Sequence, residues 1–95
     1  MAKRQKNTME KRHFAVGQTW ERDGEQREIH ELRRFSDDSK IECVTGLDKF
    51  SLIWKRPGGK PQPTCLWCST WLDWASGARL VSVNGTPVSR GNSEG

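Results

Sequence analysis

The sequence predicts a small, mainly β domain of about five short strands, with one short helical turn before the last strand. Short β-prone runs follow one another at intervals of roughly ten residues, and stretches rich in Gly, Pro, Asp and Ser separate them. The chain has 95 residues, which is enough for one domain with a thin core. With no tyrosine and a hydrophobic fraction of 33%, most of the five tryptophans are expected to be structural.

The N-terminal half opens with a predicted hairpin. Gly17–Trp20 is the first strand, and the dipeptide Asp23-Gly24 is a strong signal for a tight turn between strands. The next stretch, Glu25–Phe35, is ambiguous because its apolar residues recur every three positions, as on a helix. We favour a bulged strand, since the turn needs an extended partner, and a short helix is the alternative.

Two further strands follow the loop Ser36–Ser39. Lys40–Val44 alternates polar and apolar residues, as a half-buried strand does. Phe50–Trp54 is the most β-like run, and its alternation places Phe50, Leu52 and Trp54 on one face and Ile53 on the other.

The C-terminal part begins with a loop, Pro57–Pro63, that cannot be helical. A helix of two turns at most is predicted over Ser69–Ser76, with Ser69 or Thr70 as its cap and Gly77 as its stop. Ala78–Val83 is the last strand, which is expected to close the sheet against the first.

The formal net charge of +4 belongs to one end of the chain. Residues 1–12 contain five basic side chains and Glu10, so they account for the whole excess, and the remainder nets zero. We therefore predict a disordered basic arm over residues 1–13, a single domain over 14–83 and a flexible tail over 84–95.

The N-terminal residues lack the apolar stretch of a secretion signal, and no run is long enough to span a membrane. Three cysteines, an odd number, argue against a disulfide framework. The expected location is the cytoplasm.

The predicted order of elements resembles the Src-homology-3-type barrel. Within that group, the strand-opening Gly17–Trp20, the apolar strand in mid-chain and the terminal Trp71–Val81 resemble small phage and prophage-borne proteins. The resemblance covers roughly Val16–Val83, and its matching residues are generic packing residues. It implies a small closed barrel and a phage or bacterial context, and it implies no particular activity.

Nucleic-acid binding is the first functional hypothesis, because an aromatic residue and several cations surround the predicted loop Pro57–Pro63. Small barrels hold nucleic acids by stacking bases on aromatic rings and pairing phosphates with Lys or Arg. The basic arm would add attraction that does not depend on sequence. The candidate residues are Lys49, Trp54, Lys55, Arg56 and Lys60, assisted by Lys3, Arg4, Lys6, Lys11 and Arg12.

Protein binding is the main alternative. On the predicted helix, Trp71, Leu72 and Trp74 spread over about 160°, which is wider than the stripe that a short surface helix buries. One edge of this fan is expected to be exposed, and an exposed Trp beside polar residues is typical of a protein interface. The competing interpretation is that all three close the end of the barrel.

The pair Cys65 and Cys68 has the CxxC spacing of a zinc site. A closed site needs four ligands, and Cys43 and His30 are the candidates to complete it. Redox chemistry is a weaker alternative, because the parallel-sheet context of such dithiols is absent. The favoured interpretation is that Cys65, Trp67 and Cys68 are mainly core residues, so no cofactor is expected.

Catalysis has little support in the sequence. Neither His13 nor His30 belongs to a nucleophile motif, and the acidic residues are scattered. The sequence therefore predicts a binding module and not an enzyme.

Overall fold

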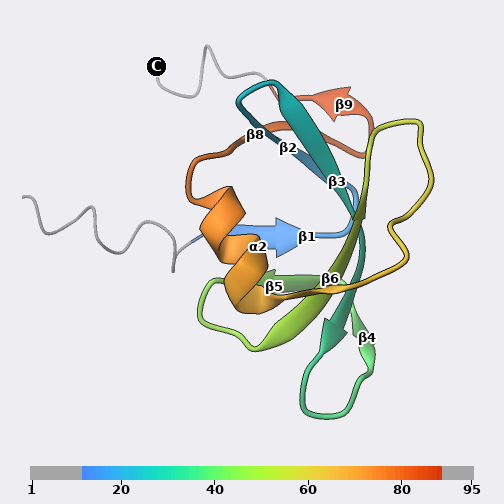
Figure 1. Ribbon diagram of the computed structural model, residues 1–95, viewed down its shortest axis with the longest axis vertical. Helices are drawn as coiled ribbons and strands as arrows, with labels where there is room; N and C mark the ends of the chain where they lie inside the picture. Colours follow the sequence, from blue (N-terminus) through green and yellow to red (C-terminus); the bar gives the residue numbers. More distant parts are fainter. Residues whose placement is uncertain (1–11, 89–95) are drawn as a thin grey trace, which may run out of the picture.

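The computed structural model describes residues 12–88, which form nine strands and one helix (Figure 1). The elements in chain order are β1 (His13–Ala15), β2 (Gln18–Arg22), β3 (Glu25–Arg34), β4 (Lys40–Ile41), β5 (Cys43–Thr45), β6 (Phe50–Lys55), β7 (Leu66–Trp67), α2 (Cys68–Ala75), β8 (Arg79–Val83) and β9 (Thr86–Pro87). The predicted mainly β class is confirmed.

The strands form one large and one small antiparallel sheet. The large sheet has the order β7-β6-β3-β2-β8-β9, with β4 pairing to β3, and the small sheet pairs β1 with β5. The last long strand, β8, pairs with β2 as expected. The sheets are not closed: β7 and β9 are free edges of the large sheet, so the described strands do not form the predicted barrel of about five strands.

The predicted hairpin between β2 and β3 is present. Asp23 and Gly24 have φ angles of 51° and 84°, and a two-residue turn of this kind requires positive φ at both positions. β3 is the bulged strand that we favoured. Its register against β6 shifts between Ile29 and Glu31, with His30 as the extra residue. The bulge explains the helix-like spacing, because it lets Ile29 and Leu32 both reach the core.

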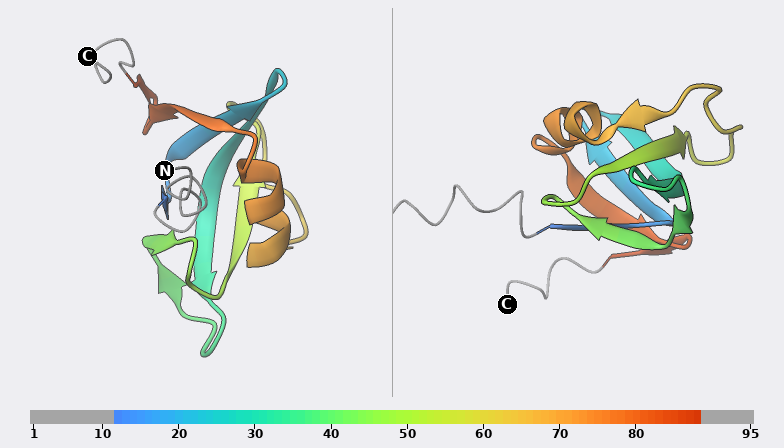
Figure 2. Two further views of the ribbon diagram at one scale, coloured as in Figure 1. Left: turned by 90° about the vertical axis from the view of Figure 1, so that its left-hand side faces the viewer. Right: turned by 90° about the horizontal axis from the view of Figure 1, so that it is seen from below.

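The core lies between the inner face of the large sheet, the β1–β5 pair and α2. On β6, Phe50, Leu52 and Trp54 are buried and Ile53 points to the other face, as predicted. The helix α2 lies along one side of the sheet (Figure 2) and buries Trp71 and Ala75. The helix thus covers a core of few large side chains, as expected for a domain of this size.

Several predicted boundaries are wrong. His13 belongs to β1 and not to an arm, and β9 with the turn before it lies in the predicted tail. That turn has positive φ at Asn84 and Gly85, again as a two-residue hairpin requires. The helix α2 begins at Cys68, one residue earlier than predicted, and no side chain caps it.

No helix in residues 12–88 is long and apolar enough to cross a membrane.

Candidate functional site

The outer face of the large sheet, opposite the core, carries an ordered row of side chains. Strand alternation turns Ser51 of β6 outward, and the pairing of the strands places Arg33 of β3 on one side of it and Trp67 of β7 on the other. One step along, Glu31 pairs with Ile53. The sheet thus brings residues of three strands, distant in sequence, onto one surface.

Two large aromatic side chains lie exposed at one end of this surface. Phe35 follows β3, and its ring contacts Trp67 with the ring centroids 4.5 Å apart and the planes at 64°. Phe35 is 55% exposed and Trp67 is 51% exposed. In a domain with so thin a core, a mutually packed aromatic pair outside the core is typical of an interaction surface.

A depression of about 310 Å³ lies beside the aromatic pair. We call its lining the aromatic surface; it consists of Arg34, Phe35, Asp38, Ser51, Cys65 and Trp67. A second depression of about 210 Å³ shares Asp38, Ser51 and Cys65 with the first and continues toward Ile53. Ser51 lines both depressions because a small side chain stands there between Arg33 and Trp67.

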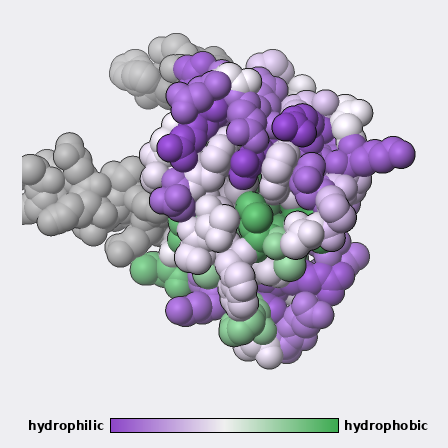
Figure 3. Space-filling view, in the orientation of Figure 1, coloured by the Kyte–Doolittle hydropathy of each residue, from purple (hydrophilic) through white to green (hydrophobic). Residues whose placement is uncertain are grey.

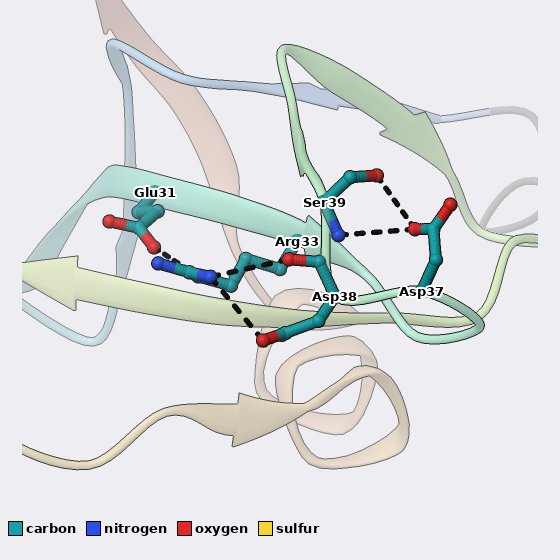
Figure 4. A network of polar contacts seen from close by, with 5 residues as sticks. All are labelled: Glu31, Arg33, Asp37, Asp38 and Ser39. Atoms are coloured by element: carbon teal, nitrogen blue, oxygen red, sulfur yellow. Dashed lines mark hydrogen bonds and ion pairs between the residues drawn. The ribbon is translucent and has the colours of Figure 1, made fainter.

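A polar network borders the second depression (Figure 4). The Arg33 guanidinium donates to the Glu31 carboxylate, to the Asp38 carbonyl oxygen at 3.2 Å and to the Asp38 carboxylate at 3.5 Å. The hydrogen bond from Arg33 lowers the pKa of Glu31, and the same contact raises the pKa of Arg33. The charges of Glu31, Arg33 and Asp38 therefore largely satisfy one another.

Asp37, in the turn between β3 and β4, is also held locally. Its carboxylate accepts hydrogen bonds from the Ser39 amide at 3.1 Å and the Ser39 hydroxyl at 2.7 Å. These hydrogen bonds lower the pKa of Asp37. The carboxylate keeps its charge at neutral pH and fixes the shape of the turn.

Two cations lie on the far side of Phe35 with little compensation. Arg34 is 3.6 Å from the Asp37 carboxylate, and about half of each side chain is exposed. Lys49 has no carboxylate within ion-pair distance among residues 12–88. Together with Phe35 and Asp48 they line a depression of about 420 Å³. Asp48 is engaged with its own turn, where its carboxylate accepts from the Thr45 amide at 2.7 Å.

Of the residues predicted to bind nucleic acid, Trp54, Lys55, Arg56 and Lys60 lie around the loop after β6, with the Arg56 guanidinium 5.6 Å from the Trp54 ring centroid, and Lys49 lies apart from them. Lys49 precedes β6 and Arg56 follows it, so their backbones are about 23 Å apart along an extended strand. Trp54 is only 9% exposed and belongs to the core, while Lys55 lies 3.8 Å from the Glu28 carboxylate. Arg56 and Lys60 are exposed in the loop after β6.

Of the predicted basic arm, Lys3, Arg4, Lys6 and Lys11 lie outside the described residues. Arg12 lies within the described residues, and its side chain makes contacts inside the domain. Its guanidinium donates to the carbonyl oxygens of Ala75 at 2.8 Å and Ala78 at 3.1 Å and lies 5.2 Å from the Trp20 ring centroid. Burial lowers the pKa of Arg12. This cation is therefore committed to the end of α2.

The residues predicted to bind protein are mostly engaged within the domain. Trp71 is fully buried, and its ring centroid lies 5.2 Å from that of Trp74. Trp74 and Leu72 are half-buried. The Arg27 guanidinium lies over both Trp74 and Trp54, at 4.5 Å and 4.3 Å from the ring centroids. Weakly polar and apolar side chains occupy the middle of the face that carries α2 (Figure 3), but these contacts leave no free indole on the helix.

The predicted zinc ligands Cys43, Cys65, Cys68 and His30 are not assembled. Within the described part of the chain, no group of three or more His, Cys, Asp or Glu side chains is placed to hold a metal ion. Cys65 is exposed on the outer face of the sheet, and Cys68 packs partly against the core at the start of α2. The separation arises because the chain changes from strand to helix between them.

The interpretation of Cys65 and Trp67 as core residues is wrong, because both are exposed, while Cys68 does pack partly against the core. Pairing between β7 and β6 turns Leu66 inward beside Leu52 and Trp67 outward beside Ser51. The exposed partner ring, Phe35, was also missed as a site residue. No local signal in the sequence pairs Phe35 with Trp67, because the register of β3, β6 and β7 sets their positions.

Comparison with protein-family models, with curated proteins and with solved structures finds no match for this chain.

Proposed function

We propose that the protein is a non-catalytic binding module that recognises a protein partner through the aromatic surface. The observation that carries this proposal is the mutual packing of Phe35 and Trp67 outside the core, beside a depression of about 310 Å³. Burying such a side chain fully is worth about 1.5–3 kcal/mol. A partner that covers both rings would gain stabilisation that the domain by itself leaves unused.

The charge around the aromatic surface favours protein over nucleic acid. On or beside the depressions, carboxylates stand among the cations Arg33, Arg34 and Lys49, so this surface offers no unbroken row of cations for a phosphate backbone. These carboxylates are Glu31, Asp37, Asp38 and Asp48. The exposed cations Arg56 and Lys60 lie at the other end of β6. Nucleic-acid binding through that loop and the basic arm stays a prediction, as do a phage origin and a cytoplasmic location.

The proposal can be tested with synthetic peptides selected from a displayed library of random sequences, because no partner is needed in advance. We expect Trp67→Ala and Phe35→Ala each to weaken binding of the selected peptides by about thirtyfold, as at a buried aromatic hot spot. Isothermal titration calorimetry gives the affinities, and circular dichroism checks that the variants stay folded.

The matched control is Val83→Ala, which removes an exposed apolar side chain from β8. It should leave peptide affinity unchanged. The proposal is overturned if selected peptides bind Trp67→Ala as well as the unaltered protein. Binding of a single-stranded oligonucleotide at low salt that disappears in Arg56→Ala with Lys60→Ala, without any peptide binding, would favour nucleic acid instead.

A further inference from the structure

We infer that the partner presents an extended segment with an apolar side chain and a nearby carboxylate, the first entering the depression beside Phe35 and Trp67 and the second pairing with Arg34 and Lys49. This inference rests on the proposed function and gives the partner its chemistry. It starts from two depressions that share a wall. Phe35 and Arg34 line both the depression of about 310 Å³ beside Trp67 and that of about 420 Å³ beside Lys49.

Phe35 therefore stands as a ridge between an aromatic half and a basic half of one surface. The backbone hydrogen bond from the Phe35 amide to the Lys49 carbonyl oxygen, at 3.2 Å, holds the two residues side by side. Neighbouring residues of an extended segment are about 3.3 Å apart. A few residues of such a segment thus reach from one half to the other.

The aromatic half selects an apolar group. Both rings offer exposed apolar surface, and because they pack edge to face with centroids 4.5 Å apart, an apolar side chain would lie against them in the adjoining depression and not between them. The volume of about 310 Å³ lies at the lower end of the range of small binding pockets. One large side chain, and not a folded surface, matches this size.

The basic half can select a carboxylate because Lys49 has no carboxylate within ion-pair distance among residues 12–88 and Arg34 has only a half-exposed one. Arg33 is held by Glu31 and Asp38, so it offers little further charge to a ligand. Arg34 reaches only the Asp37 carboxylate, at 3.6 Å, and that carboxylate already accepts two hydrogen bonds from Ser39. Arg34 can therefore turn to a second carboxylate, with Lys49 beside it as a further donor.

The carboxylate is that of an Asp or Glu side chain, because a segment that crosses both depressions presents side chains to each. Peptides synthesised with a free and with an amidated carboxyl terminus test this. Amidation should leave the affinity unchanged, and loss of binding on amidation would overturn the assignment to a side chain.

The test is a charge exchange. Random peptides are selected in parallel on the unaltered protein and on the double variant Arg34→Glu with Lys49→Glu. We expect an apolar residue near an acidic group in the first set and near a basic residue in the second. Arg34→Gln with Lys49→Gln should weaken the acidic peptides by about tenfold, and more at low salt than at high salt.

The matched control is Arg56→Gln with Lys60→Gln, which removes the same charge from the other end of β6 and should change nothing. Selected peptides that need Trp67 but show no acidic preference, or that weaken equally in both double variants, would overturn this inference and leave the proposed function standing. Peptides that bind without needing Trp67 would overturn the proposed function itself.

Discussion

Trp67 and Trp71 are four residues apart, yet they have opposite environments. Trp71 is fully buried, with its ring centroid 5.9 Å from Phe14 and 5.2 Å from Trp74. Trp67 is 51% exposed and contacts Phe35, which is itself exposed. The chain leaves β7 at Trp67 and enters α2 at Cys68, so this change of element turns one indole outward and the other inward.

This difference separates two uses of the same residue type. The inner aromatic cluster of Phe14, Trp20, Trp71 and Trp74 stabilises the fold, because its rings are removed from water by the domain itself. The aromatic surface is removed from water only when something covers it. Mutations in the inner aromatic cluster should therefore lower the stability of the fold, and mutations in the aromatic surface should lower the affinity for a partner.

The largest expected effect is on folding. Trp71→Ala should lower the free energy of unfolding by about 3–5 kcal/mol, because it empties the centre of the core. Trp67→Ala should lower it by less than about 1 kcal/mol, since only one exposed ring contact is lost. Urea unfolding followed by circular dichroism measures both. Equal losses in the two variants would show that Trp67 is a core residue after all.

A smaller loss of unfolding free energy is expected for Arg27, at the edge of the inner aromatic cluster. Arg27 lies over Trp54 and Trp74, and its guanidinium also pairs with Glu25 at 2.8 Å. Arg27→Ala should lower the free energy of unfolding by about 1–2 kcal/mol through loss of the cation–π contacts.

Arg27→Lys is the control, since it keeps the charge and loses the flat guanidinium. It should restore only part of the stability. Full restoration would mean that charge, and not stacking between the indoles, is what Arg27 contributes.

The smallest effect is on the pH dependence of stability near the aromatic surface. The hydrogen bond from Arg33 lowers the pKa of Glu31 below its ordinary value of 4.5, so this contact stabilises the folded state above that pH. The contribution is lost as the pH falls through the lower folded pKa. Glu31→Gln should therefore reduce the loss of stability on acidification, measured as urea midpoints between neutral pH and about pH 3.

A variant of the inner cluster gives the contrast. Trp71→Ala carries no titrating group, so it should lower stability by the same amount across this pH range. If Glu31→Gln leaves the acid dependence unchanged, the contact with Arg33 does not contribute to stability.

Local sequence signals predicted β2, β3, β6, α2 and β8 but not β1, β7 or β9, and the single strand predicted over Lys40–Val44 is two strands, β4 and β5, in different sheets. The turn at Asp23-Gly24 was predictable because only a few residue pairs accept positive φ at both positions. The inward face of β6 follows from its alternation, and the pairing of β8 with β2 was expected. For β3, the Asp23-Gly24 turn predicted the strand correctly and the three-residue periodicity did not. A bulge at His30 gives the strand the apolar spacing of a helix.

Long-range register was not predictable, and the candidate site depends on it. Phe35 and Trp67 meet only because Arg33, Ser51 and Trp67 fall in one row across three strands. A shift of one residue in β7 would have turned Trp67 inward and Leu66 outward. The short β7 leaves little pattern to read, so Trp67 was assigned to the core by its hydrophobicity alone.

The shortness of β7 also affects how readily the sheet edge can take part in aggregation. A free sheet edge with exposed aromatic residues is ordinarily a template on which other chains add strands and aggregate. Here the edge strand has only two residues, Leu66 and Trp67, with Pro61 and Pro63 shortly before it and α2 directly after it. Another chain would find too few free backbone groups at β7 to continue the sheet there, which disfavours strand addition beside the exposed rings of Phe35 and Trp67.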